Sequence, residues 1–191
     1  MRALWLGFPL LLLAQLRLSQ NPLSGPCRLS EDSLRPITPL HFPYLYQYQW
    51  EPRSKTEILW LSPTLQLRIE QRACIRHHIT YELRIPASYP LAGGLTRGLM
   101  NLLDTLLTLL HRENIPFLQL KKLIWPRLIE QISMRSLGEI VMLPYQEWNF
   151  LLRIDHQGNT IVATLETIKY LSTGTVQKNV LPDYMDDALE P

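Results

Sequence analysis

A cysteine beside two histidines is the first group of residues in this chain that could do chemistry. Cys74, His77 and His78 lie close together in the stretch LQLRIEQRACIRHHITYELRI, residues 65–85. A cysteine nucleophile needs a histidine within hydrogen-bond reach and a third group that orients that histidine. A zinc site needs three or four convergent ligands. Whether the three side chains can converge depends on the element that carries them.

The stretch 65–85 alternates between apolar residues at odd positions and polar residues at even positions. A period of two kept over this length predicts β-strand. It places Cys74 and His78 on the polar face and His77 on the apolar face, so the three side chains point apart. We therefore predict no catalytic residue and no metal site here. We expect the arginines and glutamates of the even positions to form a solvated face of mixed charge.

The same alternation restricts how this stretch folds. A hairpin with a two-residue loop would exchange the core-facing parity, whereas an odd-length loop or one long bent strand would preserve it. No Gly, Pro, Asn or Asp occurs between residues 65 and 85, so a tight turn is poorly encoded. We predict one long curved strand near 64–85, bent or broken at about 71–73.

Two apolar helices and a second group of strands follow. Leucines at helical spacing predict one helix over about 95–110, and FLQLKKLIWPRLIEQISM predicts another, which Pro126 must kink or restart. The chain then returns to strand, with a hairpin around Gly158. This order predicts an α+β single domain, in which a curved antiparallel sheet packs over two apolar helices.

The first twenty residues have the composition of a secretory signal. Arg2 precedes an apolar run from Ala3 to about Leu16, which is shorter than the roughly 18 residues that a membrane-spanning helix needs. We expect residues 1–20 to be a signal peptide and the protein to be extracytoplasmic, either periplasmic or secreted. The alternative is an N-terminal helix packed into the core of a cytosolic protein.

An exported chain with two cysteines predicts a disulfide, here between Cys27 and Cys74. The segment LSGPC at 23–27 resembles a bacterial lipobox, but Pro26 stands where the lipobox has a small residue, so we do not expect lipid on Cys27. In a cytosolic protein both residues would be ordinary thiols.

The remaining chain divides into three parts. We expect a proline-rich extended arm over 21–41, the α+β globular domain over 42–175 and an acidic flexible tail over 176–191. The tail contains YMDD at 184–187, which is identical to the catalytic box of reverse transcriptases. We read it as part of the acidic tail, because no strand follows to complete the hairpin on which that box holds metal ions.

An aromatic strand opens the domain. FPYLYQYQW places four aromatic residues on one face, namely Tyr44, Tyr46, Tyr48 and Trp50. They are the candidate binding residues of this sequence. The alternative, which we favour, is a half-buried sheet face, because aromatic residues are enriched in strands.

Charge and missing motifs narrow the function classes. The chain has 19 basic and 17 acidic side chains, and removing Arg2 and Arg17 with the signal leaves 17 of each. A neutral chain has no overall attraction to nucleic acid, and we expect membrane contact only through the N-terminal segment if it stays uncleaved. No nucleophile elbow, P-loop, dinucleotide-binding glycine pattern or H-E-x-x-H motif occurs, so we expect no cofactor.

The sequence favours an exported, non-catalytic binding or interaction domain of the envelope or the medium, with an apolar small molecule or a protein as its partner. One alternative is an extracytoplasmic hydrolase that uses dispersed side chains such as His78, Glu82 and Asp155. Another is a structural subunit of an envelope assembly that associates through the tyrosine face.

Overall fold

The computed structural model describes residues 30–170, except residues 40, 44, 74 and 75. A short 3-10 helix, Glu31–Ser33, precedes seven strands and two α-helices. In chain order the main elements are β1 (Gln47–Glu51), β2 (Thr56–Trp60), β3 (Gln66–Ala73), β4 (Arg76–Pro86), α1 (Leu95–Leu110), α2 (Ile115–Ser133), β5 (Ile140–Tyr145), β6 (Trp148–Gln157) and β7 (Thr160–Tyr170).

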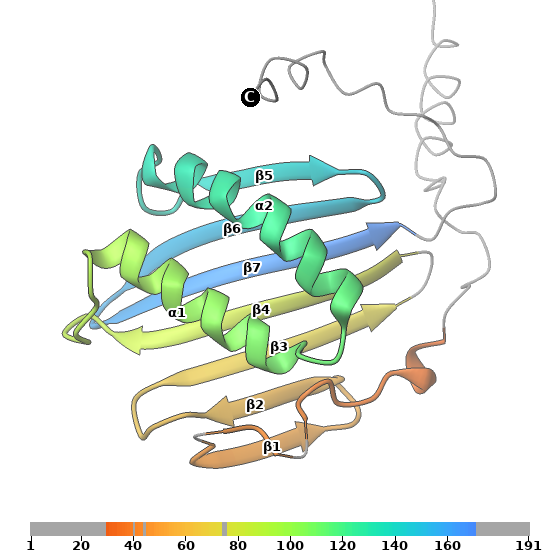
Figure 1. The fold of residues 1–191 in the computed structure, drawn as a ribbon. Helices are drawn as coiled ribbons and strands as arrows, with labels where there is room; N and C mark the ends of the chain where they lie inside the picture. The colour runs from red at the N-terminus through yellow and green to blue at the C-terminus, as the bar shows by residue number, and fades with distance from the viewer. Residues whose placement is uncertain (1–29, 40, 44, 74–75, 171–191) are drawn as a thin grey trace, which may run out of the picture.

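The seven strands form one antiparallel sheet in the order β1-β2-β3-β4-β7-β6-β5 (Figure 1). Strands β1 to β4 make one meander and β5 to β7 make a second, with both helices inserted between them. The two meanders meet where β4 pairs with β7. The α+β single domain predicted from the sequence is therefore confirmed.

Both helices lie across the same face of the sheet (Figure 1). Alternate residues of each strand point toward them, as the period of two requires. In β4 these are Ile79, Tyr81, Leu83 and Ile85, all buried. The helices contribute the facing layer through leucines that are buried in the same cluster, Leu99, Leu103, Leu106, Leu107, Leu110 and Leu128. Removing these side chains from water is the main stabilising contribution of this face.

The stretch near 64–85 is a hairpin, so the prediction of one long strand is wrong. Strand β3 pairs antiparallel with β4, and Ala73 lies opposite His77. Three residues separate that last pair, which is an odd number, so the apolar parity passes unchanged from β3 to β4. The residues favoured for tight turns are not needed for this longer connection, and their absence misled the sequence interpretation.

Helix α2 runs through Pro126 without ending there. Proline removes the hydrogen bond to the carbonyl four residues earlier, which belongs to Lys122. Both residues are exposed on the side of the helix away from the sheet, so water can satisfy that carbonyl. The second helix is therefore one helix, and no new helix starts at the proline.

A third covering element lies beside the helices on the same face. We call residues 34–43 the strap; residue 40 within it is outside the described part. Leu34 and Phe42 are buried, and Ile37 packs against the core cluster. The strap crosses β1 and β2, where the helices do not reach (Figure 1). One face of the sheet is thus covered along most of its width.

Within the described residues, neither helix combines the length and the apolar composition that crossing a membrane requires.

Candidate functional site

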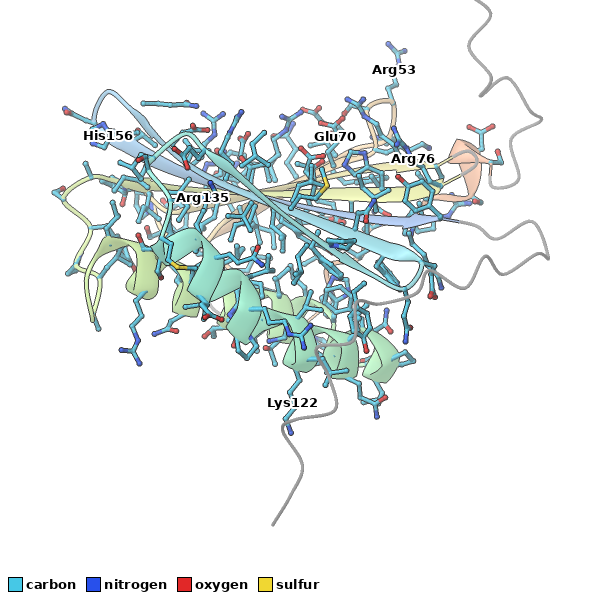
Figure 2. The ribbon with its side chains drawn as sticks, turned by 90° about the horizontal axis from the view of Figure 1, so that it is seen from above. Arg53, Glu70, Arg76, Lys122, Arg135 and His156 are labelled. Atoms are coloured by element: carbon cyan, nitrogen blue, oxygen red, sulfur yellow. The ribbon has the colours of Figure 1, made fainter. Side chains whose placement is uncertain are left out.

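The face of the sheet opposite the helices, which we call the open face, has no covering element within the described residues. Figure 2 shows Glu70 and Arg76 on this side, whereas Lys122 points away from the sheet on the far side of the helices. The even positions of β3, β4 and β7 and the odd positions of β6 point to the open face, because they alternate with the buried set.

Ion pairs between neighbours on the same strand occupy the centre of the open face. Glu70 lies between Arg68 at 3.2 Å and Arg72 at 2.6 Å. Arg84 pairs with Glu82 at 2.7 Å, and Arg153 pairs with Asp155 at 2.7 Å. The mixed-charge face predicted from the sequence is confirmed. Partly exposed pairs of this kind contribute at most about 1 kcal/mol each to stability.

The two adjacent histidines point to opposite faces, as the parity predicts. On the open face, the His78 Nε2 atom lies 2.9 Å from a carboxylate oxygen of Glu166. His77 lies on the helix side, where its Nε2 atom is buried without a hydrogen-bond partner among the described residues. Burial, Lys169 and His78 together lower the His77 pKa. Cys74 and Cys27 lie outside the described residues, so their predicted disulfide stays a prediction.

The residues suggested for a hydrolase share the open face without converging. Asp155 lies opposite Val162 of β7, which in turn lies opposite Arg84 of β4. Arg84 is six positions from His78, which corresponds to about 20 Å along a strand. Glu82 is four positions from His78, or about 13 Å. These distances do not bring the three side chains to one substrate atom.

A groove of about 400 Å³ opens at one end of the open face. The register explains how it forms: Trp60 of β2 lies opposite Gln66 of β3, which lies opposite Arg84 of β4. The lining residues come from β2, β3 and β4, from the start of β7 and from the loops that precede β3 and β7. They are Trp60, Pro63, Thr64, Gln66, Arg84, Ile85, Pro86, Asn159 and Thr160. We call it the Trp60 groove.

Arg84 is the one residue with a formal charge among those that line the Trp60 groove. Its Nε atom donates to Glu82 at 2.7 Å. Its two terminal nitrogens make no hydrogen bond to another described residue, and its side chain is 44% exposed. The groove therefore combines an indole, amide and hydroxyl groups, and a guanidinium with unused donors.

The candidate aromatic residues lie at the β1 edge on the strap side of the sheet. Tyr46 is 67% exposed and Tyr48 is 39% exposed. The Tyr48 hydroxyl donates to Glu57 at 3.2 Å, and burial together with Glu57 raises the Tyr48 pKa. Trp50 is half-buried, and Tyr44 lies outside the described residues. The tyrosine face is thus partly exposed, with one of its members tied to a buried carboxylate.

Glu57 is a fully buried carboxylate that attaches the strap to the sheet. Its two oxygens accept hydrogen bonds from the backbone N–H groups of Ile37 at 2.7 Å and Thr38 at 3.0 Å. Gln71 adds a bond of 2.8 Å to the Arg35 carbonyl. The Glu57 carboxylate thus has three donors, the two backbone N–H groups and the Tyr48 hydroxyl, which compensate for removing its charge from water. This arrangement holds the strap in place and leaves no part of Glu57 exposed to solvent.

A second buried polar pair links β4 to the end of α1. The Tyr81 hydroxyl lies 2.6 Å from Nε2 of His111. Burial lowers the His111 pKa to about 4, and His77 adds to the shift. His111 is therefore neutral at pH 7, and we assign the tyrosine as donor and the imidazole nitrogen as acceptor. The His111 ring also packs against Phe117, with centroids 4.0 Å apart.

A lysine joins the two helices. The Lys121 ammonium group contacts the Asp104 carboxylate and donates to the Thr108 hydroxyl at 2.9 Å. It also lies 5.6 Å from the centre of the Trp125 ring. The helices are thus joined by a charged contact in addition to their leucines.

Several of these residues could not be identified from the sequence. Glu57 stands in an apolar strand and signals nothing by itself, and Tyr81 and His111 are thirty positions apart. The sequence does place Gln66 and Arg84 on the polar face, but only the pairing of β2, β3 and β4 brings them beside Trp60. Within the described residues, no three His, Cys, Asp or Glu side chains are grouped so that they could hold a metal ion.

In comparisons with known proteins, no family model, no curated protein and no solved structure matches this chain.

Proposed function

We propose that this chain is an exported, non-catalytic binding domain that recognises a protein partner on the open face of its sheet. The observation that carries the proposal is the asymmetry of the sheet. One face is covered by two helices and the strap, and the opposite face has no covering element in the described part of the chain. The N-terminal signal-like composition supports export.

A protein partner fits this surface better than an apolar small molecule. The helical leucines that suggested an apolar ligand are packed against the sheet; Leu99, Leu103 and Leu107, for example, are completely buried. The open face instead presents charged and polar side chains, and apolar residues there such as Ile168 and Val162 are buried. A polar surface of this kind resembles the rim of a protein interface more than the lining of an apolar ligand site.

Cross-linking in the native host tests the proposal. We would replace Thr164, in the middle of the open face, by the photoreactive residue p-benzoylphenylalanine. A matched variant would carry the same residue at Lys122, which is exposed on the opposite side of the molecule. We expect one discrete cross-linked protein from position 164 and none from position 122. A cross-link from position 122 alone, or none from either position, would contradict the proposal.

The hydrolase alternative makes a different prediction. If the chain is a binding domain, His78→Gln and Asp155→Asn should leave the cross-link at position 164 detectable, because both substitutions keep a hydrogen-bonding side chain of similar size on the open face. If the chain is a hydrolase, the same substitutions should abolish turnover of the partner or of a molecule that the partner carries. The separation of these side chains argues against a shared reaction centre.

The exposure of Tyr46 keeps the structural-subunit alternative testable. Tyr46→Ser removes an exposed ring, whereas Tyr48→Ser would also disturb the Glu57 contact. Tyr46→Ser is therefore the cleaner variant for size-exclusion chromatography. An unchanged elution volume would count against association through the tyrosine face.

A further inference from the structure

The Trp60 groove is lined by an indole and by an arginine with free donors, with Gln66 of the intervening strand between them. The Arg84 Nε atom is occupied by Glu82, so the two terminal nitrogens remain for a ligand. Two parallel N–H groups of a guanidinium match the two oxygens of a carboxylate. No carboxylate is among the lining residues, and Glu82 occupies only the Nε side of Arg84, so the unused donors of the guanidinium favour an anion over a cation.

We propose that the Trp60 groove binds a carboxylate adjacent to a flat apolar group, as in an acidic side chain or the C-terminus of an extended protein segment. The flat group lies on Trp60, and the carboxylate pairs end-on with Arg84. The inference rests on the proposed function for the source of the carboxylate, a protein partner.

The other lining groups suit a short peptide. Gln66, Asn159 and Thr160 carry amide and hydroxyl groups whose side chains make no hydrogen bond to another described residue. Such groups can pair with the backbone N–H and C=O of an extended segment. A volume of about 400 Å³ holds one or two residues, which makes the groove an anchor point within a larger interface.

The chain supplies a matched control for Arg84. Arg153 likewise contacts a carboxylate through Nε, at 2.7 Å from Asp155, and this pair is 45% and 19% exposed, against 44% and 19% for Arg84 and Glu82. Arg153 lies on the same open face but does not line the groove. Replacing either arginine by glutamine removes the same charge from a similar environment. A difference between the two variants therefore measures the contribution of the groove to carboxylate binding.

The experiment uses two probes that differ only in their terminal group, N-acetyltyrosine with a carboxylate and N-acetyltyrosine amide with a neutral carboxamide. Each is titrated into the full chain while the indole N–H signal of Trp60 is followed by NMR, assigned through Trp60→Phe. We expect the carboxylate to bind about tenfold more tightly than the amide, because a bidentate charged pair is formed only with the carboxylate. Arg84→Gln should abolish this preference, Arg84→Lys should weaken it, and Arg153→Gln should preserve it.

Three results would overturn the inference. The two probes could bind equally, Arg153→Gln could reduce the preference as much as Arg84→Gln, or a neutral N-acetylglucosamine trimer could shift the Trp60 signal at lower concentration than the carboxylate. These results are distinguishable from failure of the proposed function. If a partner is cross-linked at position 164 but the groove shows no carboxylate preference, only the proposal of carboxylate binding in the groove is refuted. If the groove prefers the carboxylate but no protein is cross-linked, the proposal that a protein supplies the carboxylate is refuted.

Discussion

The two faces of this sheet are built from alternate residues of the same strands and differ in almost every physical property. Leu67 and Arg68 are neighbours in β3, yet Leu67 is completely buried under the helices and Arg68 pairs with Glu70 on the open face. On the covered face, specific partners compensate for the burial of polar groups such as Glu57 and His111, whereas the buried Nε2 atom of His77 has no partner among the described residues. On the open face, charged groups pair with neighbours and stay partly in water.

This difference separates stability from recognition. Burial of apolar area makes the covered face the main source of folding free energy. Exposed ion pairs contribute little, so substitutions on the open face are tolerated by the fold. A surface that can change without unfolding the protein can be adapted to a partner, which is why we assign recognition to the open face.

The largest effect should come from a substitution on the covered face. Leu67→Ala removes a completely buried side chain and should lower the free energy of unfolding by about 2–5 kcal/mol. Its neighbour provides the control, because Arg68→Gln should cost less than about 1 kcal/mol. Urea unfolding of both variants measures the difference. Equal losses would show that the two faces do not differ in the way described.

Acid should weaken the covered face through His111. Its pKa is about 4 in the folded protein and 6.5 ordinarily, so between these values the unfolded chain binds more protons. This contribution to stability is complete above pH 6.5 and is lost as the pH falls toward 4. The total loss is roughly 3 kcal/mol, because each pKa unit corresponds to about 1.4 kcal/mol.

His111→Gln isolates that contribution, since glutamine does not titrate and can still accept a hydrogen bond from Tyr81. Urea unfolding at pH 7, 5.5 and 4.5 should give a shallower pH dependence for the variant than for the original chain. Parallel curves for the two proteins would mean that His111 does not sense acid in this range.

A smaller effect is expected where the strap joins the sheet. Glu57→Gln replaces one of the accepting oxygens by an NH2 group that faces a backbone N–H. We expect a loss of about 2 kcal/mol and faster hydrogen exchange at the amides of Ile37 and Thr38. Glu51→Gln, at a partly exposed carboxylate of β1, should leave both exchange rates unchanged. Unchanged exchange in Glu57→Gln would show that Glu57 does not hold the strap on the sheet.

The assignment of residues to the covered face and the open face could largely be predicted from the sequence. The alternation over 65–85 assigns the described residues of β3 and β4 to the correct face, including the opposite directions of His77 and His78. The helices and the hairpin at Gly158 are also encoded locally, because periodicity and turn residues act over a few positions; Gly158 takes the positive φ of 60° that its loop requires.

The features that local pattern could not predict depend on contacts between distant segments. The three residues between the paired Ala73 and His77 carry no turn signature, so the sequence does not distinguish one bent strand from a hairpin. Glu57 becomes meaningful only when the strap, about twenty positions earlier, reaches it. The Trp60 groove requires the register of three strands and the loop at Asn159 together.

The most direct test of the division is an alanine scan of β4 from Ile79 to Arg84 with two measurements on each variant. One is the free energy of unfolding, and the other is the yield of partner cross-linked through the photoreactive residue at position 164. We predict opposite phases with a period of two: Ile79, Tyr81 and Leu83 control stability, and Thr80, Glu82 and Arg84 control cross-linking in a folded protein. If the even positions leave the cross-link unchanged, the open face is not the recognition surface.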